Sequence, residues 1–375
     1  MKNVHFCAIL IVLFLISIIS IIGCGNATGG GGGGGAGVTN RSGIFSYAGT
    51  QSPGDTWTWT ISTTEYTGTN ESLSFTISGT WDALSSGFSK ATVTFSSTTE
   101  IAAGDGFYFL EIPNTALLVK PHNPGDERPI ICTSLTTFEP AASFRFLCVK
   151  IPDAGWNPSS HAIATGDSTV PSTRTFHLNW YLITGEFAEP QTASDFTFSD
   201  GTFTSTSIGA KVFMTNSNIF VEDDGTGEGG SIGAIYEDLS GTPIRTVLSH
   251  TFKGFRYGYD SALQTGETQA ATGTYAKIDG FDAWKGNPYM TDADIDNNNT
   301  AGTFGVKITF EANPQQPTGF VPGIVTDLSN NQPENVQCVV SKVGPAGKQK
   351  YVIFGIGLKN STVQPFNFIL LQTSN

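Results

Sequence analysis

The sequence predicts an all-β protein of antiparallel strands that form one or more barrels or sandwiches. Three observations carry this prediction. Apolar residues alternate with Thr and Ser along the body of the chain, turn residues interrupt it at short intervals, and no stretch sustains an apolar helical stripe through three turns. Without such helices, the crossovers that a parallel sheet requires are missing. The residues leave barrel and sandwich both open.

Composition agrees with a folded core. Of 375 residues, 39% are hydrophobic and 11% aromatic, whereas only 14% are charged. This is too apolar for a disordered chain. The net charge of −13 comes without a basic cluster that could neutralise phosphates, so we expect no nucleic-acid partner. It equally disfavours attachment to an anionic membrane through a polybasic patch.

The first predicted element is an export signal over residues 1–23. Lys2 precedes a predominantly apolar run over residues 6–22, and Gly23 and Cys24 follow it. The run is close to the shortest length that spans a bilayer, about 17 residues, so its length also allows an uncleaved membrane helix.

The segment Ile21-Ile22-Gly23-Cys24 resembles the lipobox of bacterial lipoproteins. The resemblance implies cleavage before Cys24 and acylation of its thiol with fatty chains such as palmitate. Two or three chains on one residue would anchor the protein to a membrane stably. Because Gly25 is not Asp, the resemblance implies the outer membrane of the bacterial cell envelope. Whether the protein faces the periplasm or the cell surface stays open.

Residues 24–43 are predicted to be a flexible tether that follows the acylated cysteine. Gly29 to Gly35 are seven consecutive glycines, a composition that cannot bury surface. Such a coil has a typical reach of roughly 25 Å.

The body is predicted to form two β domains, residues 44–187 and 188–375. The boundary is placed in the polar segment around Gly185 to Pro190, where a strand-like run ends. The triplet Gly79-Thr80-Trp81 resembles the Gly-x-Trp that opens lipocalin barrels, and this three-residue resemblance implies a lipocalin-like barrel as one form of the open choice between barrel and sandwich. No clean internal repeat is visible. Alternating strand patterns occur at residues 56–61, 72–77, 93–95, 176–180, 196–198, 252–257, 306–310 and 366–368.

Three cysteines lie in the body of the chain. Cys132 and Cys148 are on candidate strands 16 positions apart, and an exported protein permits disulfides, so we predict a bond between them that contributes about 3 kcal/mol. Cys338 is predicted to be a small buried residue in a strand. A catalytic cysteine is the alternative, although no neighbouring residue would lower its pKa.

The strongest chemical motif is the acidic segment Asp292-Ala293-Asp294-Ile295-Asp296-Asn297-Asn298. Its alternate side chains resemble the opening ligands of an EF-hand-type calcium loop, which implies a weak Ca²⁺ site formed by Asp292, Asp294, Asp296 and Asn298. Asn297 replaces the glycine of that loop, and Thr303 replaces its final Glu. An acidic hairpin loop without metal is the alternative.

Other catalytic motifs are weak. Residues 225–230 match Gly-x-Gly-x-x-Gly, but they follow acidic residues and precede no helix, so we interpret them as a turn. No histidine pair has the spacing of zinc ligands, and no serine lies in a nucleophile elbow. The sequence therefore favours a protein that is not an enzyme.

The leading hypothesis is a membrane-tethered lipoprotein that acts as a binding or interaction module. Its expected partners, besides the membrane, are a glycan, an apolar ligand or an envelope protein. Trp156 and Trp284, beside Gly and Asn, are the candidate ligand contacts, whereas Trp57 and Trp59 are predicted core residues. The alternatives are a secreted carbohydrate-active hydrolase with dispersed catalytic carboxylates and a lipid-carrying β-barrel.

Overall fold

The computed structural model describes residues 43–51, 54–121, 128–135, 144–151, 162–168, 174–182, 187–190, 194–199, 202–205, 209–214, 218–223, 230–235, 244–260, 265–278, 281–299, 306–310, 321–327, 332–357 and 366–373. These residues form 25 strands, numbered β1 to β25, and two short helices. The strands pair antiparallel, which confirms the predicted all-β class.

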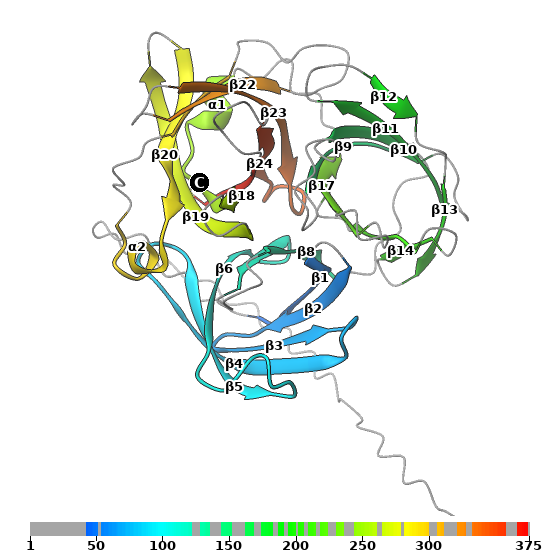
Figure 1. Ribbon diagram of the computed structural model, residues 1–375, viewed down its shortest axis with the longest axis vertical. Helices are drawn as coiled ribbons and strands as arrows, with labels where there is room; N and C mark the ends of the chain where they lie inside the picture. Colours follow the sequence, from blue (N-terminus) through cyan, green and yellow to red (C-terminus); the bar gives the residue numbers. More distant parts are fainter. Residues whose placement is uncertain are drawn as a thin grey trace, which may run out of the picture. The chain divides into compact units, whose positions relative to one another are not determined.

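The first eight described strands form a closed barrel (Figure 1). Each strand pairs with the next one along the chain, and β8 returns to pair with β1. Closure leaves the barrel without an unpaired strand edge. The strands are β1 Phe45–Gln51, β2 Asp55–Ile61, β3 Glu65–Asn70, β4 Phe75–Ala83, β5 Ser89–Ser96, β6 Gly106–Ile112, β7 Ala116–Lys120 and β8 Ile130–Ser134.

Period-two alternation places aromatic side chains inside this barrel. On β2, Trp57, Trp59 and Ile61 are buried in its interior cluster, whereas Thr60 between them is exposed. Opposite Trp59 on β3 stands Gly68, where an added Cβ would lie 2.6 Å from the indole ring. The missing side chain at position 68 is therefore what makes room for the large indole.

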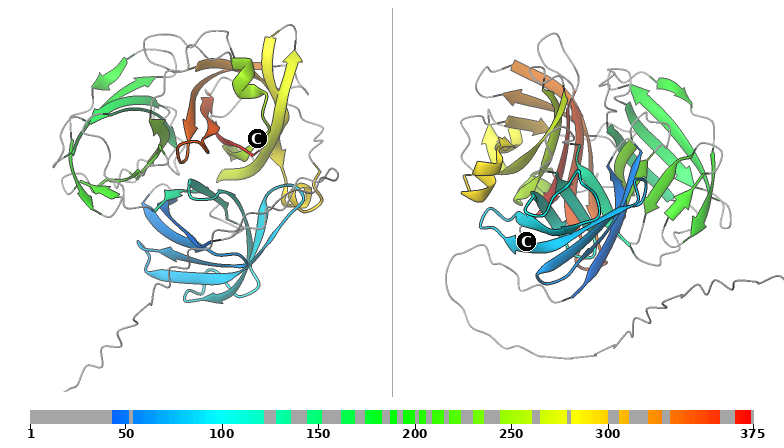
Figure 2. Two further views of the ribbon diagram at one scale, coloured as in Figure 1. Left: turned by 180° about the vertical axis from the view of Figure 1, so that it is seen from behind. Right: turned by 60° about the horizontal axis from the view of Figure 1, so that its bottom comes forward.

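The next nine described strands form a second sheet that also closes (Figure 2). Pairing of β9 with β17 and of β10 with β11 joins eight of them in a ring. The short strands β12 and β13 both pair with β11, so together they take the place of one interrupted strand. The strands are β9 Phe144–Ile151, β10 Ala162–Ser168, β11 Arg174–Leu182, β12 Phe187–Pro190, β13 Ser194–Ser199, β14 Thr202–Thr204, β15 Lys211–Met214, β16 Ile219–Asp223 and β17 Gly230–Ile235.

The last eight described strands close a third barrel through pairing of β18 with β25. Helix α1, Ile244–Leu248, precedes it and contributes Val247 and Leu248 to the cluster of buried side chains in its interior. Helix α2, Asp292–Asp296, follows β20. The strands are β18 Phe252–Asp260, β19 Thr265–Ile278, β20 Phe281–Met290, β21 Val306–Phe310, β22 Val321–Asp327, β23 Gln332–Val343, β24 Lys350–Gly357 and β25 Phe366–Gln372.

The predicted division into domains 44–187 and 188–375 is wrong. Its boundary falls inside β12, in the middle of the second sheet, and the described strands form three successive meanders. The physical reason is that strand pairing closes each group of strands upon itself. The polar sequence around Gly185 to Pro190 resembled a linker.

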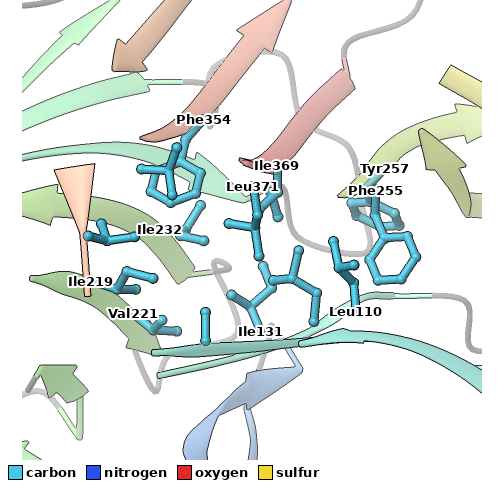
Figure 3. Close-up of a cluster of buried hydrophobic side chains, with 14 of the residues drawn as sticks. Leu110, Ile131, Ile219, Val221, Ile232, Phe255, Tyr257, Phe354, Ile369 and Leu371 are labelled. Atoms are coloured by element: carbon cyan, nitrogen blue, oxygen red, sulfur yellow. The ribbon is translucent and has the colours of Figure 1, made fainter. Parts of the chain in front are cut away.

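Outward-facing side chains from all three sheets meet in one buried cluster (Figure 3). The first barrel contributes Leu110 and Ile131, the second sheet Val221, and the third barrel Phe255 and Ile369. Each of these side chains is no more than 3% exposed. The sheets therefore share an apolar core, in addition to the clusters inside the first and third barrels.

The predicted disulfide between Cys132 and Cys148 is wrong. Both are buried thiols that are not joined to each other. Cys132 lies on β8 in the interior cluster of the first barrel. Cys148 lies on β9 of the second sheet, next to Gly233 on β17. The two sulfurs thus belong to different sheets. Cys338 is buried in β23, as predicted, and burial raises the pKa of the Cys132 and Cys338 thiols.

Candidate functional site

A cavity of about 120 Å³ lies at one end of the first barrel. This end carries the β1–β2, β3–β4 and β5–β6 turns and the ends of β7 and β8. Exposed side chains such as Leu73 and Glu100 form its rim, and buried Trp59 forms part of its wall. The lining residues are Gln51, Asp55, Trp57, Trp59, Asn70, Leu73, Phe75, Ile77, Val93, Glu100, Ile101, Asp105, Gly106, Phe107, Val119, Pro121 and Ile130.

Aromatic rings form much of the cavity wall. Trp57 and Trp59 stack at 5.3 Å between ring centroids, because alternate residues of β2 face the same side. Phe75 meets Trp57 edge-on at 5.4 Å, and Phe107 meets Trp59 edge-on at 5.5 Å. Because these rings pack against one another, the cavity wall is in place before a ligand binds.

A chain of polar contacts fixes one side of the rim. The Trp57 Nε1–H donates to Gln51 Oε1 at 3.2 Å, and Gln51 Nε2 donates to the Arg128 carbonyl oxygen at 3.1 Å. The Arg128 guanidinium in turn binds the Asp55 carboxylate at 3.1 Å. The charge of Asp55 is therefore balanced by its neighbour.

The opposite side of the rim is the loop between β5 and β6. Glu100 and Asp105 are both exposed there. One carboxylate oxygen of Asp105 accepts the Ala102 N–H at 2.7 Å, which closes a tight turn in the loop. No Lys, Arg or His occurs among the described residues that line the cavity. The described residues that line the cavity therefore carry a net negative charge.

Two buried polar atoms in the interior of this barrel have no hydrogen-bond partner among the described residues: Trp59 Nε1 and the Tyr66 hydroxyl. The two rings are neighbours, at 6.1 Å between centroids, and Tyr66 lies farther from the rim than Trp59 does. Burial raises the pKa of the Tyr66 hydroxyl. Buried polar atoms without partners are rare in proteins and call for a specific explanation.

The acidic segment proposed as a Ca²⁺ site does not bring three of its carboxylates together in the described structure. It folds as helix α2, whose Thr291 and Asp294 form a reciprocal capping box. The Asp294 carboxylate accepts hydrogen bonds from Thr291 and Asn299, and these bonds lower its pKa. Asn298 is exposed with a positive φ of 53° at the helix end.

The other two aspartates of α2 bind the first barrel. Asp292 forms an ion pair with Lys120 at 2.7 Å, and Asp296 forms one with Lys90 at 2.7 Å. The Tyr108 hydroxyl also donates to Asp296, at 3.0 Å. Burial, followed by this hydrogen bond, raises the pKa of Tyr108 to about 12. Within the described part of the chain, no three His, Cys, Asp or Glu side chains gather closely enough to hold a metal ion. The carboxylates of Asp292, Asp294 and Asp296 therefore all have partners within the protein.

The remaining sequence-predicted sites have no described side chains. Cys24, the signal segment 1–23 and nearly all of the tether 24–43 lie outside the described residues, as does Trp156. The backbone of Trp284 is in β20, where it pairs with Tyr275 and Ile308. Among the described helices, none has the length and apolar character needed to span a membrane.

Sequence reasoning missed the cavity. Trp57 and Trp59 are buried strand residues, as predicted, but they also line a space that a ligand could fill. The alternation of apolar and polar residues predicts which face of a strand points inward. It does not predict whether the inward side chains fill the interior of the barrel. Two features of the sequence pointed to a cavity: a glycine, Gly68, on the strand after Trp59, and several aromatic residues near turns of the same meander.

Comparison with known proteins assigns no family. No protein-family model matches the chain, and no curated protein matches it. Among solved structures, the β chain of DNA polymerase III from Streptococcus pneumoniae TIGR4 is 7% identical, covering 88% of this chain and 92% of that chain, with a TM-score of 0.11. A TM-score this low carries no argument about fold or function.

Proposed function

We propose that the protein is a non-enzymatic binding protein of the bacterial cell envelope, whose first barrel holds a small ligand. The cavity at the end of that barrel is the observation that carries the proposal. Its aromatic wall is preformed, its rim is open to solvent, and two unpartnered polar atoms lie in the same interior. Preformed, mostly apolar cavities with a few polar groups are typical of ligand sites.

The size of the cavity favours a compact ligand. An apolar cavity of about 150 Å³ is known to hold benzene, and drug-sized ligands occupy pockets of roughly 300 Å³ or more. At about 120 Å³, this cavity matches a single ring or a branched group of similar size. A long acyl chain exceeds it, so the lipid-carrying alternative is not supported by this site.

Binding is tested by titrating the mature protein with toluene and with 3,3-dimethylbutan-1-ol in a calorimeter. We expect saturable binding that Val119→Phe weakens at least tenfold, because the larger side chain fills the cavity from β7. Ile130→Phe fills it from the neighbouring strand and gives a second, independent test. Thr80→Phe, exposed on the outer face of β4, is the matched control.

Melting temperatures show whether each variant still folds. If the folded wild type binds no compact probe, charged or neutral, or if the filled variants bind as well as the wild type, the proposed site is wrong. Turnover of an oligosaccharide by the wild type would instead support the hydrolase alternative.

The membrane anchor is a separate part of the proposal, supported by the lipobox resemblance. Mass spectrometry of protein from a native or Gram-negative host should find an N-terminal, acylated Cys24. Cys24→Ala should leave the protein unacylated and release it from the membrane fraction, whereas Cys7→Ala, within the signal segment, should change neither. Unmodified Cys24 in the wild type contradicts the anchor but leaves the ligand site unaffected.

A further inference from the structure

The charges around the cavity favour a ligand with a positive charge. Three carboxylates line it, and no basic residue does so among the described residues. Asp55 is balanced by Arg128, whereas Glu100 and Asp105 form no ion pair with the described residues. Both lie on the β5–β6 loop and are exposed at the rim. Their potential attracts a cation to the opening and repels an anion.

The wall of the cavity can accept such a cation. Trp57, Trp59, Phe75 and Phe107 surround the space, and the π-electrons of aromatic rings attract positive charge. The interaction is strongest with tryptophan and with a desolvated cation. Apolar neighbours such as Val93 and Val119 complete the wall.

The same wall is unsuited to a metal ion or a bare ammonium ion. Metal ions such as Ca²⁺ require several oxygen ligands, and a bare ammonium ion needs hydrogen-bond acceptors to replace its water. An ammonium group covered by alkyl groups has no such requirement, because its surface is apolar and its charge is spread over a larger volume. A trimethylammonium group also matches a cavity of about 120 Å³.

We propose that the first barrel binds a small alkylammonium cation, with the alkyl groups against the aromatic wall and with Glu100 and Asp105 facing its charge from the rim. This inference rests on the proposed function, since it assigns the chemical class of the ligand to the same cavity. It also separates this site from a fatty-acid site, because a carboxylate ligand meets like charge at the opening.

Two isosteric probes test the role of charge. Choline and 3,3-dimethylbutan-1-ol have the same shape and differ in whether nitrogen or carbon carries the three methyl groups. We expect choline to bind at least about tenfold more tightly in calorimetric titrations at low ionic strength. The anionic analogue 3,3-dimethylbutanoate should bind more weakly than the alcohol.

Neutralising the rim tests the role of the two carboxylates. In the variant that combines Glu100→Gln with Asp105→Asn, choline affinity should fall about three- to tenfold while the affinity for the alcohol stays constant. Asn keeps an acceptor oxygen for the Ala102 N–H, so the loop should retain its turn. The matched control combines Glu65→Gln with Asp82→Asn, which are exposed at the other end of the same barrel and should change neither affinity.

The outcomes distinguish this inference from the proposed function. If the alcohol or the anionic analogue binds as tightly as choline, the cation assignment is wrong and the binding function stands. If choline affinity falls equally in the rim variant and in the control variant, the rim carboxylates have no specific role and the inference also fails. If toluene, choline and the alcohol all fail to bind, the proposed function itself is wrong.

Discussion

At the scale of single residues, the first barrel contains two tyrosines that differ in how their hydroxyl groups are bonded. The Tyr47 hydroxyl donates to the Glu111 carboxylate and accepts the Asn114 N–H at 3.2 Å. The Tyr66 hydroxyl is equally buried but makes no hydrogen bond with the described residues. A buried hydroxyl without a hydrogen bond destabilises the folded state, whereas a hydrogen-bonded hydroxyl stabilises it.

We therefore expect opposite effects from the same substitution at these two positions. Tyr47→Phe should lower the free energy of unfolding by about 1–2 kcal/mol, because it removes a bond to a carboxylate. Tyr66→Phe should leave that free energy unchanged or raise it by about 1 kcal/mol. Urea denaturation of both variants measures the difference. A loss at Tyr66 as large as at Tyr47 would mean that the Tyr66 hydroxyl has a partner in solution.

At the scale of elements, helix α2 connects the third barrel to the first through two ion pairs of unequal burial. The side chain of Lys120 is 10% exposed in its pair with Asp292, whereas that of Lys90 is 43% exposed in its pair with Asp296. Removing the partner of a mostly buried charge is costly, but an exposed pair contributes little.

The two aspartates should consequently differ in their effect on stability. Asp292→Asn should lower the free energy of unfolding by about 2 kcal/mol, since it leaves the Lys120 ammonium without this carboxylate. Asp296→Asn should cost less than about 1 kcal/mol, because water can solvate Lys90. Chemical denaturation of both variants tests this ranking, and equal losses would contradict it.

The pKa shifts around α2 predict how the stability of this helix changes with pH. Hydrogen bonds from Thr291 place the pKa of Asp294 below its usual value of 3.8, so this contribution is present above that pH and is lost as pH falls through the lowered pKa. The bond to Asp296 raises the pKa of Lys90 above 10.5, so its contribution is present below that pH and is lost as pH rises further. Hydrogen exchange of the Ile295 and Asn297 amides should thus show constant protection between about pH 4 and pH 10, after correction for intrinsic rates.

The elements differ in how far the sequence predicts them. Alternating strands such as β2 and β4 were predictable, because one face is buried and the other is polar. Helix α2 was not, since its five residues are too few for an apolar stripe, and its Asp spacing resembled a metal loop. The capping box of Thr291 and Asp294 was the sequence signal that favoured a helix start.

At the scale of the whole molecule, several strands are buried on both faces. In β7, Leu117 and Val119 belong to the interior of the first barrel, whereas Leu118 belongs to the core shared by the three sheets. In β8, Ile131 also belongs to the shared core, between inward-facing Ile130 and Cys132. Their continuous apolar sequence reflects these two cores. The three barrels were not predictable from the sequence. They share an order of paired strands, but their amino-acid sequences show no visible repeat.

The shared core should make the three sheets unfold together. We expect calorimetry to show one main transition, and Ile369→Ala in β25 to lower its free energy of unfolding by about 2–5 kcal/mol without splitting it. Ile131→Asp should abolish folding or separate the transition into parts, because it places a charge in the shared core. Thr67→Asp, exposed on the outer face of β3, is the control and should change little. Separate transitions in the wild type would contradict a common core.

The direction of β1 bears on how the protein can be used as a reagent. The described chain begins at Gly43 and enters the first barrel at Phe45, while the other end of β1, Gln51, lines the cavity. The seven extended residues of β1, about 23 Å of strand, thus separate the start of the barrel at Phe45 from the opening of the cavity. Immobilisation on a sensor chip through the N-terminus should accordingly leave the opening accessible to analytes in the flow.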